Sequence, residues 1–129
     1  MKLFLLFRKL VLLTFIALFL SSCEYAYNYT YTVKNSADTT IEIHMKTYRV
    51  DSVYNLAKGE ERTLYKTEHG VEPWSGPYFD DVDHDLHFFS VKKRSVQSSR
   101  DYLKNSSWSF EKEGRIEGKY KTTVTSAEF

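Results

Sequence analysis

The sequence holds one cysteine, Cys23, and two prolines among its 129 residues. A single thiol excludes an intramolecular disulfide, an iron–sulfur cluster and any zinc site built from several thiolates. A folded domain of this chain is therefore held together by its core, without covalent crosslinks.

The chain also has little net charge, because 18 basic residues are balanced by 17 acidic ones. The first 22 residues contain Lys2, Arg8 and Lys9 and no acid, so residues 23–129 are slightly acidic. Nucleic-acid binding is favoured by a strongly basic surface. The charge balance therefore predicts no nucleic-acid partner.

The short motifs typical of catalysis are missing as well. There is no G-x-S-x-G nucleophile elbow, and none of the five glycines belongs to a Gly-rich loop between a strand and a helix. Serine, histidine and aspartate are all present, but no spacing indicates a catalytic triad. We therefore expect a protein that is not an enzyme, with no catalytic residues and no cofactor.

One long apolar run is present, and it lies near the start of the chain. The three basic residues named above precede an almost wholly apolar stretch at residues 10–20. This length suits the hydrophobic region of a signal peptide and falls short of the roughly 20 residues that a spanning helix needs. The run ends in Leu-Ser-Ser-Cys at residues 20–23, which resembles the lipobox of bacterial lipoproteins.

The lipobox resemblance implies cleavage between Ser22 and Cys23, a diacylglycerol thioether on the Cys23 sulfur and an acylated Cys23 amino group, commonly as palmitate. Residues 1–22 are then the signal peptide, and residues 23–129 are the mature domain. Two or three acyl chains anchor a protein stably in a membrane, at about 0.8 kcal/mol for each buried methylene. The resemblance therefore predicts a lipid-anchored protein of the bacterial cell envelope.

The face of the membrane follows from the residues after the anchor. The surface-export signal of such lipoproteins needs an acidic cluster, whereas only Glu24 is acidic directly after Cys23. We therefore expect attachment to the outer membrane facing the periplasm, with display on the cell surface as the alternative.

Strand patterns fill most of the mature sequence, which is rich in tyrosine, and these patterns alternate polar with apolar residues. Strands are expected from Tyr25 onward, at 41–46, 53–56, 62–67 and 86–91, and in a terminal hairpin whose last strand buries Tyr120, Thr122 and Val124. No segment shows a helical period. Residues 68–79 and 92–107 are expected to be loops.

Six or seven short strands with turns between them indicate an all-β fold. We predict a single antiparallel β-sandwich of immunoglobulin-like architecture, with a small β-barrel as the alternative. In the first loop, Trp74 is the best candidate for an exposed aromatic residue, because Pro73, Gly76 and Pro77 stiffen its surroundings.

The stretch DDVDHDLHFF at residues 80–89 has the composition of a metal site. Asp81, Asp83 and Asp85 have the spacing that begins an EF-hand loop, but the loop's glycine and final glutamate are replaced by Leu86 and Lys92. In an extended segment, alternate carboxylates lie about 6.7 Å apart along the strand. That separation is too large for three of them to share one ion, so we predict no metal site.

An extended conformation of this stretch explains its alternation. Val82, Leu86 and Phe88 then point inward and the acidic side chains outward, while His84 is the exception on the apolar side. We predict a solvated strand edge or a surface for a partner or ligand. That surface comprises Trp74, Asp81, Asp83, Asp85 and His87.

The mature chain also resembles the small all-β lipoproteins of unknown function found in Bacteroidota. The resemblance lies in the Tyr-rich first strand, the LAKGEERTL turn and the YKTTVTSAEF ending. Bacteroidota O-glycosylate exported proteins at Asp-Ser/Thr followed by a small or aliphatic residue. The resemblance therefore implies possible O-glycosylation at Thr39 and Ser52.

These features together predict a membrane-anchored envelope lipoprotein that is a non-enzymatic binding or accessory module for an envelope protein. Two alternatives remain open at this stage. One is an inhibitor or immunity-type lipoprotein acting through residues 72–78, and the other is a carbohydrate- or metal-binding lipoprotein that uses Trp74 and the acidic stretch.

Overall fold

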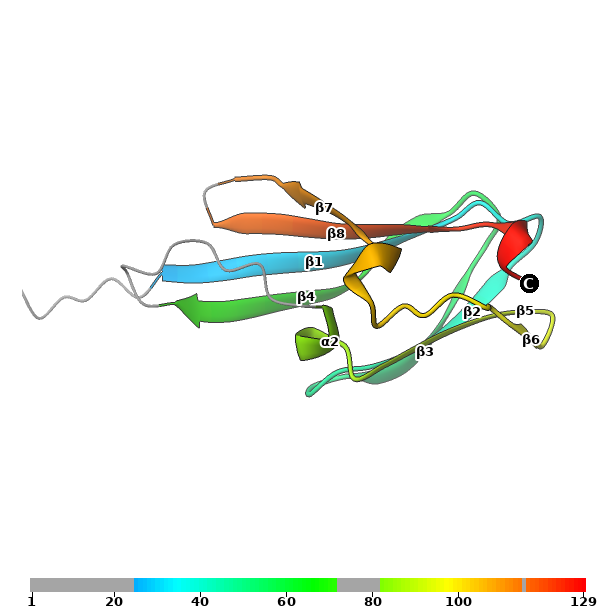
Figure 1. Ribbon diagram of the computed structural model, residues 1–129, viewed down its shortest axis with the longest axis horizontal. Helices are drawn as coiled ribbons and strands as arrows, with labels where there is room; N and C mark the ends of the chain where they lie inside the picture. Colours follow the sequence, from blue (N-terminus) through cyan, green and yellow to red (C-terminus); the bar gives the residue numbers. More distant parts are fainter. Residues whose placement is uncertain (1–24, 72–81, 115) are drawn as a thin grey trace, which may run out of the picture.

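The computed structural model describes residues 25–71, 82–114 and 116–129. Within these ranges the chain forms two four-stranded sheets, A and B, packed face to face (Figure 1). In spatial order, sheet A contains β4 (Glu61–Val71), β1 (Tyr25–Asn35), β8 (Glu117–Val124) and β7 (Ser109–Lys112). Sheet B contains β3 (Asp51–Leu56), β2 (Ile41–Lys46), β5 (Phe88–Lys93) and β6 (Val96–Gln97).

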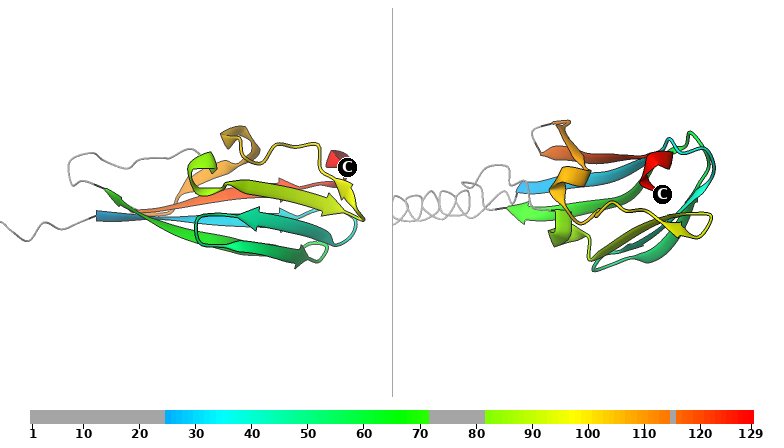
Figure 2. Two further views of the ribbon diagram at one scale, coloured as in Figure 1. Left: turned by 90° about the horizontal axis from the view of Figure 1, so that it is seen from below. Right: turned by 45° about the vertical axis from the view of Figure 1, so that its right-hand side comes forward.

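The predicted all-β sandwich is confirmed, and neither sheet closes into a barrel within the described ranges. Those ranges hold eight strands, more than the six or seven expected, and β1 pairs with β8 in parallel while the other pairs are antiparallel. Sheet B covers only part of the length of sheet A, so β1 and β4 project beyond it (Figure 2). That projection decides where the candidate site lies.

Alternation along the strands places the core between the sheets. On β1, Tyr29, Tyr31 and Val33 are buried, and the buried residues of β2 likewise alternate with more exposed ones. The predicted inner face of the last strand is confirmed, since its residues 120, 122 and 124 are all buried. Period-2 burial of apolar side chains therefore specifies the register of both sheets.

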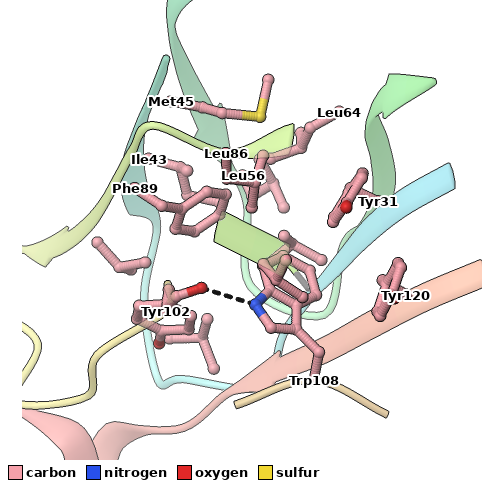
Figure 3. Packing of buried hydrophobic residues seen from close by; sticks show 14 of the residues in the cluster. Tyr31, Ile43, Met45, Leu56, Leu64, Leu86, Phe89, Tyr102, Trp108 and Tyr120 are labelled. Atoms are coloured by element: carbon pink, nitrogen blue, oxygen red, sulfur yellow. Dashed lines mark hydrogen bonds between the residues drawn. The ribbon is translucent and has the colours of Figure 1, made fainter. Parts of the chain in front are cut away.

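An aromatic cluster fills the centre of the core (Figure 3). The ring of Trp108 lies edge-on to Tyr31 and to Phe89, with ring centroids 5.5 Å apart in each pair. Its indole Nε1 donates a hydrogen bond of 2.8 Å to the carbonyl oxygen of Tyr102, so the buried polar atom has a partner.

The chain ends in a short 3-10 helix, η2 (Ser126–Glu128), that ties the terminus to the loop before η1 (Asn105–Ser107). The buried Glu128 carboxylate accepts hydrogen bonds from Arg100 Nη2 at 2.6 Å, from Ser98 Oγ at 3.1 Å and from the Tyr102 hydroxyl. Burial, together with the hydrogen bond to Glu128, raises the pKa of Tyr102. These contacts fix residues 98–102 against the end of β8.

Two segments predicted as loops are partly strand. Residues 68–71 continue β4, because they pair with residues 25–28 at the start of β1. Within 92–107, β5 runs to Lys93 and pairs with β6 across a two-residue turn. Arg94 and Ser95 in that turn have φ values of 48° and 70°, the left-handed conformation that a tight hairpin of this type requires.

The predicted signal peptide, the cleavage site at Ser22 and Cys23, and the lipidated Cys23 all lie outside the described residues. Trp74 and Asp81 lie outside them as well. Among the helices of the described ranges, none has the length and apolar character needed to cross a membrane.

Candidate functional site

Residues 82–85 form one turn of helix, α2 (Val82–Asp85), so the prediction of an extended segment here is wrong. The Leu86 amide donates to the Val82 carbonyl at 2.9 Å, and the Val82 amide donates to Asn105 Oδ1 at 2.8 Å. Both apolar side chains are fully buried. Their spacing of four residues fits the same face of a helical turn, and the short helix therefore packs its apolar side on the core.

Asp85 points inward, not outward as predicted, and its side chain is only 5 % exposed. Its two oxygens have separate partners. The Tyr31 hydroxyl donates to Oδ2 at 2.5 Å, and His69 Nε2 lies 2.8 Å from Oδ1. A buried carboxylate is tolerated only with such partners, so this cluster joins α2 to β1 and β4 beneath the projecting part of sheet A.

A groove of about 330 Å³ opens beside this cluster, along the outer edge of β4. One wall is β4 itself, and the opposite wall is formed by the β2–β3 turn and α2. We call it the β4 groove. Its lining residues are Tyr48, Arg49, Tyr65, Lys66, Thr67, Glu68, His69, His84 and Asp85.

Phe88 begins β5 and lies on the outer face of sheet B, opposite Lys46 of β2, and the exposed His87 directly precedes it. The Phe88 side chain is 42 % exposed, so its predicted inward orientation is wrong. Its ring lies edge-on to His44, with centroids 5.1 Å apart, and His87 lies edge-on to Tyr48, with centroids 4.1 Å apart. The segment is helical up to Asp85 and β5 begins only at Phe88. Phe89 and Val91 of this strand therefore face the core, and Phe88 faces solvent.

Val53 completes this surface, because it is the cross-strand neighbour of His44 on β3. Tyr48 and Val53 are 83 % and 54 % exposed. We define the aromatic patch as Tyr48, Val53 and Phe88 together with His44 and His87. Charged groups border it, since Asp51 accepts from His44 Nε2 at 2.7 Å and pairs with Lys46 Nζ at 2.9 Å. The hydrogen bonds from His44 and Lys46 lower the pKa of the Asp51 carboxyl.

The histidines therefore collect around residues 82–89 although they are spread along the sequence. His69 and His84 border the β4 groove, with ring centroids 5.7 Å apart, and the other two belong to the aromatic patch. His69, Tyr48 and Val53 were not predicted as site residues from the sequence. Only the unusual parity of His84 hinted that the stretch is not a simple strand.

The acidic stretch does not converge on one point. Asp83 is exposed on α2, Asp85 is turned inward, and His87 lies on the patch. Over the described ranges, no group of three or more histidine, cysteine or acidic side chains is arranged to hold a metal ion. The two residues proposed for O-glycosylation lie elsewhere: Ser52 is half-buried on β3, and Thr39 borders a second groove of about 410 Å³.

Comparison of the chain with protein-family models, with curated proteins and with solved structures gave no match.

Proposed function

We propose that this protein is a lipid-anchored lipoprotein of the bacterial envelope whose sandwich docks a protein partner through the aromatic patch. One observation carries the proposal. Four large hydrophobic side chains are strongly exposed in the described part of the chain. Two of them, Val53 and Phe88, flank His44 on the outer face of sheet B, and a third, Tyr48, lies against His87 in the adjacent β2–β3 turn. Clustered exposure of this kind is typical of a protein-binding surface, whereas scattered apolar residues are normal on any protein.

The composition of the patch supports protein docking. Aromatic residues dominate the energetics of protein interfaces because they bury a large area with few rotatable bonds. The patch places two aromatic side chains beside two imidazoles, which offer both apolar surface and hydrogen-bonding nitrogens. The ion pairs at its border suit the polar rim that surrounds the core of an interface.

The anchor proposed at Cys23 makes the partner an envelope protein. β1 begins at Tyr25, so one residue, Glu24, lies between the first strand and the lipidated Cys23. The β2–β3 turn, which carries Tyr48, points toward the same end of the molecule as the start of β1 (Figure 1). The patch therefore faces a partner that lies near the same membrane, in our proposal the periplasmic side of the outer membrane.

The experiment is crosslinking in intact cells, followed by purification of the full chain through a C-terminal tag with the anchor retained. We expect one stoichiometric partner with the wild-type chain. Phe88→Lys or Val53→Lys places a charge in the patch and lowers recovery of this partner at least about tenfold. Val96→Lys is the matched control, because Val96 is 52 % exposed on sheet B outside the patch.

Two results would contradict the docking proposal. One is purification of the wild-type chain alone, and the other is recovery of the partner with Phe88→Lys and Val53→Lys equal to its recovery with the control Val96→Lys. A Cys23→Ala arm tests the anchor separately. The proposal predicts that this variant moves to the soluble fraction, because it lacks its acyl chains. Membrane retention of the Cys23→Ala chain would overturn the anchor and leave the docking result to be judged by the patch variants.

A further inference from the structure

The outer edge of β4 is the longest unpaired strand edge in the described part of the chain. β4 spans Glu61–Val71 and pairs through its other edge with β1, and no described strand forms a ladder along its outer side. The nearest contact from sheet B is the Tyr54 hydroxyl of β3, which donates to the Leu64 carbonyl oxygen at 3.4 Å. An edge of this length presents a row of backbone donors and acceptors that another strand can extend. The β4 groove beneath it leaves space beside the strand at residues 65–69.

The charges along this edge are self-complementary. Lys66 and Glu68 are both exposed on the outer face of sheet A, and Thr67 lies between them on the inner face. In an antiparallel pair centred on Thr67, residue 66 of one strand stands opposite residue 68 of the other. Each Lys66 then meets a Glu68, and this happens twice because the arrangement is two-fold symmetric.

We propose that a second copy of this chain pairs with β4, antiparallel and centred on Thr67, so that two A sheets join into one continuous sheet. Regular pairing extends over residues 65–69 of each strand and stops short of the β-bulge at Leu64. On the inner face Thr67 meets its own counterpart, and Tyr65 of each copy meets His69 of the other above the β4 groove. Cross-strand threonine pairs and opposite charges both stabilise antiparallel sheets.

The neighbouring registers are disfavoured by the same residues. Centring the pair on residue 66 places Lys66 opposite Lys66, and centring it on residue 68 places Glu68 opposite Glu68. A slip by one residue turns exposed side chains against buried ones, because the side-chain period of a strand is two. Centring on residue 65 brings the β-bulge opposite Tyr31 and Thr32 into the middle of the pairing. The charges thus select one register.

The two proposals are tested at separate residues, because Val53 and Phe88 do not line the β4 groove, although Tyr48 of the patch does. The test uses the full chain, solubilised in detergent, and measures its mass by size-exclusion chromatography with light scattering. Lys66→Glu and Glu68→Lys each replace two attractive pairs with two repulsive ones. We expect the wild type to be dimeric and each single variant to dissociate at least about tenfold more readily.

Restoration of the charge pattern makes the test specific for the register. The double variant Lys66→Glu/Glu68→Lys should dimerise like the wild type, and a mixture of the two single variants should form a heterodimer. Lys58→Glu, in the exposed turn before β4, changes the net charge by the same amount as Lys66→Glu and should remain dimeric. A monomeric wild type, single variants that dimerise normally, or a mixture that stays monomeric would each overturn the proposal.

Discussion

Asp85 is the residue on which the inside of the candidate site depends. It is a buried acid that accepts from the Tyr31 hydroxyl and pairs with His69, so its side chain connects three elements of the fold. Its neighbour Asp83 lies on the same helical turn and is exposed to solvent. The two aspartates share a chemical type and a local conformation and differ in burial and partners.

This difference gives a direct prediction for stability. Asp85→Ala removes the acceptor of a buried hydroxyl and a nearby imidazole, and we expect it to lower the free energy of unfolding by about 2–3 kcal/mol. Asp83→Ala removes an exposed carboxylate and should change the free energy by less than about 0.5 kcal/mol. Urea unfolding followed by tryptophan fluorescence measures both values. Equal effects of the two substitutions would show that Asp85 has no special role.

Single residues also show how far sequence reasoning reaches. The burial of Tyr31, Tyr120 and Val124 was predictable, because each lies on the apolar side of an alternating strand. The burial of Asp85 was not, since an acid is normally placed in solvent. Its inward orientation depends on Tyr31 and His69, which are distant in sequence, and no local pattern encodes that contact.

At the scale of elements, even a helix of one turn can hold an end of the sandwich in place through its hydrogen bonds. η2 is one turn long, yet its Glu128 accepts from the backbone amide of Thr125 at 3.0 Å as well as from the side chains of residues 98–102. The loop before η1 therefore has its position set by the last turn of the chain.

We therefore expect Glu128→Ala to lower the free energy of unfolding strongly, although residue 128 lies next to the C-terminal residue. It leaves Arg100 without its buried acid and removes the acceptor of the Tyr102 hydroxyl, so we expect a loss of about 2–4 kcal/mol in the free energy of unfolding. Glu113→Ala is the control, because Glu113 lies 3.8 Å from Lys119 in an exposed pair and should contribute little. Thermal unfolding of both variants decides the comparison. Similar melting temperatures for the two would contradict this account of η2.

Elements with a clear period were predictable, and those with an ambiguous one were not. β2 and β8 alternate over their full length and were found at the expected places. α2 was missed because Val82 and Leu86 are four residues apart, a spacing that fits both a helical turn and one face of a strand. The continuation of β4 beyond residue 67 depends on pairing with β1, which its own glycine-containing sequence does not show.

At the scale of the whole molecule, strand content and length were enough to predict a sandwich. Within the described ranges, the division into two sheets of four strands and the parallel pairing of β1 with β8 depend on contacts between distant parts of the chain. The same long-range contacts create both candidate surfaces. The aromatic patch unites β2, β3 and β5, and the β4 groove unites β4, α2 and the β2–β3 turn.

The two proposed contacts, docking through the aromatic patch and self-pairing through β4, are compatible in one molecule. Val53 and Phe88 of the aromatic patch lie on the outer face of sheet B, Tyr48 also lines the β4 groove, and the proposed self-pairing edge belongs to sheet A. A dimer formed through β4 would leave the patch residues Val53 and Phe88 of both copies available, because neither residue lines the β4 groove. We therefore expect the partner to be recovered equally well with monomeric β4 variants.

The central claim is that the aromatic patch is a docking surface, and site-specific photocrosslinking in intact cells tests it most directly. A photoreactive phenylalanine analogue replaces Phe88 in the full chain, and the same analogue replaces Val96 in the control. The account predicts a light-dependent adduct with one envelope protein from position 88 and none from position 96. No adduct at position 88, or the same adducts from both positions, would contradict it.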